Sequence, residues 1–111
     1  MSTPPAGNKD GADKAAKFRV DDLKNFTTKL LQSAGLLPAE AACLAESLVQ
    51  ADMRGVSSHG LMRLRTYAER VRCGVVRGGV VPRIVRESPA FLGIDGGNGN
   101  GMWVARQVME R

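Results

Sequence analysis

The sequence has few of the residues that build metal sites and disulfide frameworks. Its 111 residues include one histidine and two cysteines. A zinc site needs three or four Cys, His or acidic ligands, so we expect no bound metal. A GxSxG elbow is also missing, which argues against a serine hydrolase. Cys43 and Cys73 lack CxxC spacing, and we interpret them as small buried thiols in a reducing compartment.

Long apolar runs are missing as well. No stretch approaches the ~20 residues that a membrane-spanning helix needs, so we expect no membrane partner. The first 17 residues, MSTPPAGNKDGADKAAK, lack the apolar core of a secretory signal. They are polar and rich in Pro, Gly, Ala and Lys, which predicts a disordered tail over residues 1–17. We therefore expect a cytoplasmic protein with one folded region, residues 18–111.

Positive charge is concentrated in one segment of the chain. The net charge is +5, but residues 54–86 contain eight arginines and a single acid, Glu69. Such a segment could face a carboxylate, a phosphate or an acidic protein surface. Its only aromatic residue is Tyr67, so it lacks the stacking pattern of single-strand binders, and we expect no nucleic-acid partner. A basic helical interaction module remains the non-enzymatic alternative.

Apolar residues at three- and four-residue steps predict a first helix after a short extended segment over residues 18–20. Asp21 or Asp22 can cap this helix, and Gly35 stands in the position that ends it. The residues expected on its buried face are Leu23, Phe26, Leu30 and Leu31.

Two further helices follow. Pro38 suits the first turn of a second, more apolar helix that runs to about Met53. Gly55 breaks the pattern, so a third helix is expected with Ser58 and His59 at or near its start, ending at Gly74. The expected buried residues are Ala41, Ala42, Leu44, Ala45, Leu48, Val49 and Ala51 in the second helix and Leu61, Leu64, Tyr67, Ala68 and Val71 in the third.

The last part of the chain predicts a β-hairpin and a helix. Residues 83–87 alternate and are β-branched, Ser88-Pro89 makes a turn, and residues 90–95 form the second strand. The run from Gly96 to Gly101 lacks the one-three-six glycine spacing of a Rossmann loop, so we interpret it as a turn into the last helix. The fold class is therefore α/β, with a three-helix bundle followed by a β-hairpin and a helix. We expect this unit to be part of a larger sheet domain, because the last helical pattern ends without a terminator.

The only histidine lies in the most informative segment, ADMRGVSSHGLMRL, residues 51–64. His59 can exchange a proton near neutral pH, and Arg63, four residues later, can clamp a carboxylate. On one helical face near a helix N-terminus, the two would suit an anionic substrate. Ser58 can bind substrate or, more in keeping with serine before a helix, cap it. Asp52 and Arg54 are expected to form an ion pair that fixes the loop.

This segment, followed by Tyr67 and Gly74, resembles the pattern ADxRGxxSHGxxR of the type-2 malate/L-lactate dehydrogenase family. The resemblance extends from about Phe18 to Arg111 and implies an oxidoreductase that uses NAD or NADP. The substrates implied are small 2-oxo or 2-hydroxy acids such as malate or lactate, or cyclic imino acids. It makes His59 the general acid/base and Arg63 the substrate clamp.

The resemblance also implies a larger, non-Rossmann NAD(P)-binding α/β fold and a homodimer. Members of that family are several times longer than this chain, so it implies an N-terminal fragment that is inactive alone. A second family histidine and most of the nicotinamide site would then lie beyond Arg111. A degenerate pseudo-enzyme is a further alternative, and neither the substrate nor the choice between NAD and NADP follows from these residues.

Overall fold

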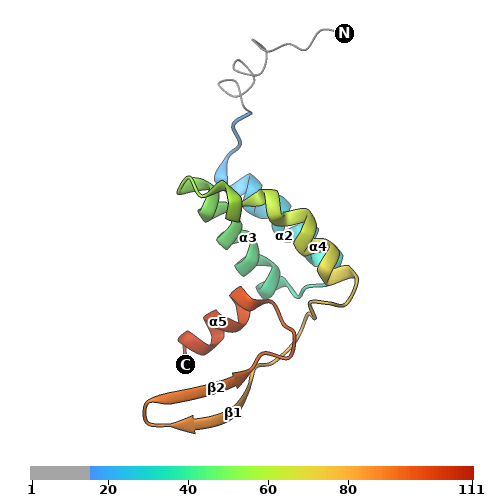
Figure 1. The fold of residues 1–111 in the computed structure, drawn as a ribbon. Helices are drawn as coiled ribbons and strands as arrows, with labels where there is room; N and C mark the ends of the chain where they lie inside the picture. Colours follow the sequence, from blue (N-terminus) through green and yellow to red (C-terminus); the bar gives the residue numbers. More distant parts are fainter. Residues whose placement is uncertain (1–15) are drawn as a thin grey trace, which may run out of the picture.

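The computed structural model describes residues 16–111; the tail predicted over residues 1–17 lies outside them except for residues 16 and 17, which belong to no helix or strand. The elements in chain order are α2 (Val20–Ala34), α3 (Pro38–Met53), the short 3-10 turns η1 (Ser57–His59) and η2 (Leu61–Arg63), α4 (Leu64–Arg72), β1 (Arg83–Ser88), β2 (Phe91–Asp95) and α5 (Gly101–Met109). Figure 1 shows α2, α3 and α4 grouped together, with the hairpin and α5 beyond one end of that group. The predicted α/β class is confirmed for these residues.

The core lies between the three long helices. Leu44 and Leu48 of α3 are fully enclosed, together with Leu31 of α2, and Val71 of α4 is buried beside them. Burial of one such side chain contributes about 1.5–3 kcal/mol to stability. Ala41 and Ala45 are also fully buried, and their small side chains let the neighbouring helices approach α3 closely.

The buried face of α2 differs from the predicted one. Phe26 is 62% exposed, whereas Thr27, with Leu31 and Ala34, points into the core. The predicted end of the helix is confirmed: Gly35 adopts φ +132°, and the Leu36 N–H donates to the Leu31 carbonyl at 3.1 Å. At the start, Val20 already belongs to the helix rather than to an extended segment, and no side chain caps it.

A buried carboxylate joins the helices to the segment that precedes the hairpin. Glu40, in the first turn of α3, is only 3% exposed. Its two oxygens accept the Leu37 N–H at 3.1 Å and the Gly79 N–H at 2.7 Å. Next to Gly79, Gly78 packs so closely against the Gly35 carbonyl that a Cβ would come within 2.5 Å of that oxygen. The Glu40 and Gly35 contacts together hold the segment that follows α4 against the start of α3 and the end of α2.

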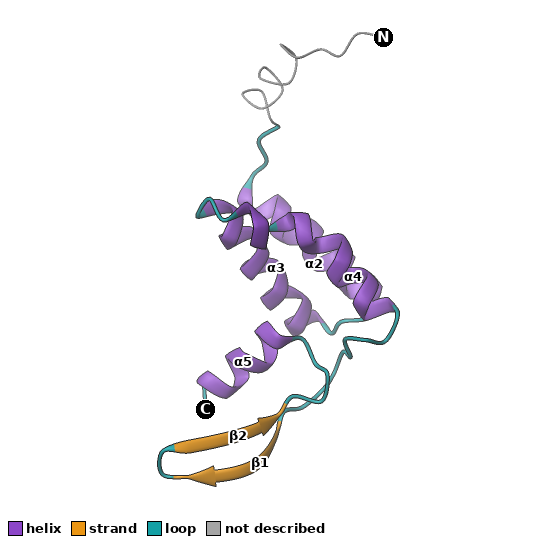
Figure 2. Ribbon diagram, in the orientation of Figure 1, coloured by secondary structure: helices purple, strands orange, loops and turns teal. Residues whose placement is uncertain are grey.

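The hairpin is confirmed within about one residue of its predicted bounds. Its strands are antiparallel, with Arg83 opposite Asp95 and a bulge between Ile84 and Arg86. Figure 2 shows it extending away from the helices, with α5 between it and α3. No residue of β1, β2 or α5 is buried in the described structure. Arg106 of α5 reaches Glu46 of α3 at 3.2 Å, which links the two parts.

The two cysteines differ in environment. Cys43 is buried as predicted, and this burial raises the pKa of its thiol. Cys73, expected to be buried, is exposed because it follows the last turn of α4, just before Gly74 turns the chain away with φ +79°. Within residues 16–111 no helix is long and apolar enough to cross a membrane.

Candidate active site

The segment that carries the only histidine forms two tight turns between α3 and α4. Gly55 ends α3 with φ +78°, and the Val56 N–H donates back to the Ala51 carbonyl at 2.8 Å. The chain then makes the 3-10 turn η1, passes through an extended Gly60, and makes the second turn η2. Ser58 and His59 lie in η1, and Arg63 closes η2. All three side chains are exposed.

The expectation of one continuous helix through His59 and Arg63 is wrong, because α4 begins only at Leu64. The helix is interrupted at Gly60, whose backbone is extended (φ −95°, ψ −150°) instead of helical. Next to it, Asp52 in the last turn of α3 accepts the Leu61 N–H through Oδ2 at 2.9 Å. His59 therefore lies in a 3-10 turn and not at the N-terminus of α4, whose dipole begins at Leu64.

Asp52 lies beside the candidate site, but its partner differs from the one that the sequence predicted. The expected ion pair with Arg54 is not among the ion pairs of residues 16–111, and Asp52 binds the backbone of Leu61 instead. Gly60 packs against this carboxylate, and a Cβ built on it would collide with Asp52. Aspartate and glycine eight residues apart thus fix the path of the turn. In the sequence, the only indication of this contact was the presence of both Asp52 and Gly60 in the motif.

The side chains of the turn form a chain of close contacts. Ser58 Oγ lies 2.8 Å from His59 Nδ1, and Arg63 Nε donates to the Ser58 carbonyl at 2.8 Å. Ser58 thus contacts the imidazole rather than capping a helix, which corrects the predicted cap. Arg63 thus contacts the backbone of Ser58 and the Ser58 hydroxyl contacts the His59 ring, and two short turns, not one helix, connect the three residues.

This arrangement leaves the reactive ends of two side chains free. With Nδ1 held by the Ser58 hydroxyl, Nε2 of His59 is the nitrogen available to a ligand. With Nε of Arg63 held by a carbonyl, the two terminal amino groups of the guanidinium can grip a carboxylate. An accessible imidazole nitrogen and a guanidinium with two accessible amino groups are the types of group that proton exchange and carboxylate binding require. Residues 16–111 contain no group of three or more His, Cys, Asp or Glu that could hold a metal ion.

The glycine-rich run does not form a phosphate cradle. A Cβ on Gly97, whose φ is +58°, would come within 2.7 Å of Val80, and one on Gly99 would come within 3.3 Å of Val80 and 3.2 Å of Val104. Side chains thus occupy the space that a dinucleotide loop keeps for phosphate. The residues described here do not fit a classical dinucleotide loop, and the run is a turn into α5, as its spacing predicts.

The fold and the site define a helical domain that presents a histidine and an arginine on a turn between two helices. A family model described as malate/L-lactate dehydrogenase matches residues 18–111. The chain belongs to this family.

Two curated relatives illustrate the match. The chain is 37% identical over 94 residues to a malate dehydrogenase of Pyrococcus horikoshii, covering 81% of this chain and 25% of the relative. It is 33% identical over 93 residues to an L-sulfolactate dehydrogenase of Methanocaldococcus jannaschii, covering 84% and 27%. The solved structure of the Pyrococcus horikoshii OT3 malate dehydrogenase superposes with a TM-score of 0.81 at 35% identity, over 86% of this chain and 27% of that one. The chain thus spans about a quarter of the length of these relatives.

Proposed function

We propose that this chain supplies the proton-transfer and carboxylate-binding residues of an oxidoreductase that acts on a small 2-oxo or 2-hydroxy acid or a cyclic imino acid. The observation that carries the proposal is the contact chain from Arg63 through Ser58 to His59 on an exposed turn. Relatives named malate and sulfolactate dehydrogenases support the class of substrate, because both names describe carboxylates with an adjacent hydroxyl.

Each residue has a distinct role in the proposal. Arg63 grips the substrate carboxylate, and His59 Nε2 gives a proton to the oxygen or nitrogen that forms on reduction, or takes it in the reverse direction. Ser58 binds Nδ1, which fixes the ring orientation and leaves Nε2 toward the substrate. NAD or NADP, when bound, supplies or accepts the hydride. We assign no residue of this chain to the cofactor.

Further properties follow the family. We propose that residues 18–111 form the N-terminal part of a larger dehydrogenase domain that works as a homodimer. We also propose a cytoplasmic location, since Cys43 and Cys73 are both free thiols. The substrate is then the partner, with neither nucleic acid nor membrane involved.

The test is a nicotinamide-absorbance assay of the protein that carries this chain, with a panel of 2-oxo acids and cyclic imino acids. On the best substrate, His59→Ala should lower kcat about a hundredfold or more with cofactor affinity unchanged. Arg63→Ala should chiefly raise KM, and Arg63→Lys should restore only part of the loss, because a lysine cannot form the two-pronged contact.

Arg65→Ala is the matched control. This arginine is exposed, lies two residues from Arg63 and pairs with Glu69 at 3.1 Å. Wild-type kinetics in His59→Ala and Arg63→Ala would refute the assigned roles. A folded protein with no turnover on the whole panel would favour the pseudo-enzyme or the interaction module.

A further inference from the structure

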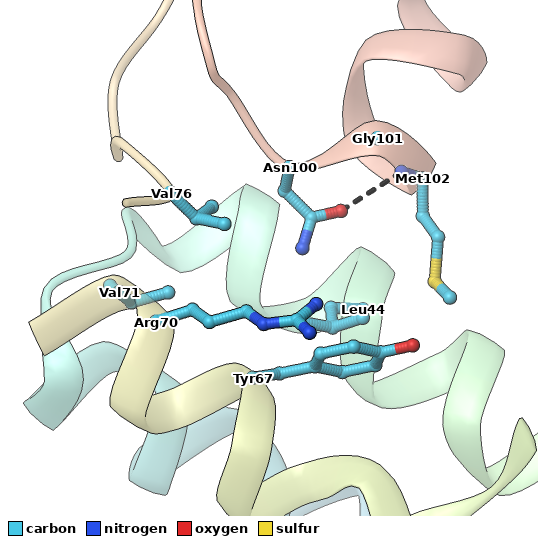
Figure 3. A pocket seen from close by; sticks show the side chains of 8 residues that line it. All are labelled: Leu44, Tyr67, Arg70, Val71, Val76, Asn100, Gly101 and Met102. Atoms are coloured by element: carbon cyan, nitrogen blue, oxygen red, sulfur yellow. Dashed lines mark hydrogen bonds between the residues drawn. The ribbon is translucent and has the colours of Figure 1, made fainter. Parts of the chain in front are cut away.

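A second candidate site lies between α3, α4 and the start of α5. It is a cavity of about 230 Å³ with Tyr67, Arg70 and Asn100 in its polar lining and Leu44, Val71 and Met102 in its apolar lining (Figure 3). Ser58, His59 and Arg63 are not among the lining residues, so the cavity is distinct from the turn described above. Its volume falls below the range of about 300–1,000 Å³ typical of drug-sized ligands, which favours a small molecule.

The polar groups that face this cavity are mainly hydrogen-bond donors. Arg70 makes none of the ion pairs found within residues 16–111, and no acidic residue lines the cavity. Figure 3 shows its guanidinium extending into the space between Tyr67 and Asn100. A guanidinium has five N–H donors and no acceptor. An unopposed one in a concave site suits an oxyanion.

Asn100 adds a donor whose direction is fixed. Its Oδ1 accepts the backbone N–H groups of Met102 at 3.0 Å and Trp103 at 3.2 Å, as the cap of α5. Because the oxygen is committed to the backbone, the amide nitrogen is turned toward the side of the cavity where Arg70 lies (Figure 3). Arginine and asparagine thus present donors to the same space.

The remaining wall is apolar. Leu44, Val71, Val76 and Met102 supply hydrocarbon beside the polar end of the cavity. Inorganic anions gain nothing from such a wall, whereas a short alkyl chain gains about 25 cal/mol per Å² that it buries. The combination of a donor-rich end and an apolar wall discriminates in favour of an organic anion.

We propose that this cavity binds a small organic carboxylate, with the carboxylate against Arg70 and Asn100 and a short apolar chain along Leu44, Val71 and Met102. The proposal does not depend on the dehydrogenase function, because it concerns binding at residues that take no part in the contacts around His59. It also gives the second half of α4 a role separate from that of Arg63.

The test is an NMR titration of the 111-residue chain with hexanoate, following the Arg70 Nε–H and Asn100 side-chain NH₂ signals. Hexanol and inorganic phosphate serve as the two partial probes, one without the anion and one without the chain. Hexanoate should shift both signals saturably, and each partial probe should bind about tenfold more weakly or not at all. Arg70→Ala and Arg70→Gln should each weaken hexanoate binding about tenfold.

Arg72→Ala is the matched control, since Arg72 is exposed on α4 and does not line the cavity. It should bind hexanoate like the wild type. Equal hexanoate affinity in the wild type and in folded Arg70→Ala and Arg70→Gln would overturn the proposal. So would shifts confined to the residues around His59 and Arg63, or a phosphate affinity equal to that of hexanoate.

Discussion

The contact between Gly60 and Asp52 gives a quantitative test of how the turn that carries His59, residues 55–63, is held. A methyl group on Gly60 would occupy the position of the Asp52 carboxylate, so Gly60→Ala must push that carboxylate away from the Leu61 N–H. The hydrogen bond is exposed, and its loss costs about 1 kcal/mol. Residual crowding in a tight turn adds about another 1 kcal/mol. We therefore expect Gly60→Ala to lower the free energy of unfolding by about 2 kcal/mol.

Asp52→Ala removes the same hydrogen bond without crowding and should cost about 1 kcal/mol. In the double variant the added methyl group meets no carboxylate, so the total cost should stay near 1 kcal/mol instead of the roughly 3 kcal/mol of an additive pair. For a domain of this size, 1 kcal/mol corresponds to about 4–8 °C in Tm.

The measurement is thermal unfolding of the four proteins by circular dichroism, with Gln50→Ala as a control because Gln50 is exposed on the same helix. Amide exchange at Leu61 reports the hydrogen bond directly and should speed up in both single variants. Additive losses in the double variant would refute the steric argument. So would unchanged exchange at Leu61 in Asp52→Ala.

Three further predictions concern the core, the hairpin and the thiols. Leu48→Ala should destabilise the chain by about 2–5 kcal/mol in a denaturant titration, because Leu48 is fully enclosed. Hydrogen bonds from the Gly97 N–H and then from Arg83 lower the pKa of Asp95. The stability that Asp95 contributes is therefore complete above the ordinary aspartate pKa and is lost as pH falls through the lowered value. An NMR pH titration should place the Asp95 midpoint below that of an unstructured aspartate, and Asp95→Asn should abolish the transition. A thiol reagent should label Cys73 rapidly and Cys43 only on unfolding, and equal rates would contradict the burial difference.

Local signals predicted most of the fold. The helices, the hairpin and the helix end at Gly35 follow from periodicity and from residues that favour turns. The buried face of α2 did not follow, because Leu31 belongs to two overlapping stripes of one helix. The stripe with Phe26 is the more apolar, yet the stripe with Thr27 and Ala34 is the buried one. Choosing between two such faces requires the position of the neighbouring helix.

The turn that carries His59 and Arg63 was predicted in composition and not in conformation. The motif identified both residues. It did not reveal that an extended Gly60 delays α4 until Leu64, or that Asp52 takes the amide of Leu61. That contact joins residues nine apart across a turn, and helical spacing rules describe only neighbours three and four apart. The buried contact of Glu40 was not predicted for the same reason, since its partner Gly79 lies 39 residues further along the chain.

The difference in sequence separation leads to a last prediction. The contacts that set Ser58, His59 and Arg63 all fall within a short segment, whereas the cavity at Arg70 depends on α5 being held near α3. Glu40 contributes to that placement through Gly79. Glu40→Ala leaves two backbone N–H groups without their charged acceptor and should cost about 3 kcal/mol.

Glu40→Ala should therefore weaken hexanoate binding at Arg70 while the His59 ring signals keep their wild-type NMR positions. Glu40→Gln keeps the shape of the side chain and one acceptor oxygen, so its hexanoate affinity should lie between those of the wild type and Glu40→Ala. If Glu40→Ala moved the His59 signals as much as those of Arg70, the turn would depend on the hairpin segment. The contacts within residues 51–63 would then be insufficient to set the geometry around His59.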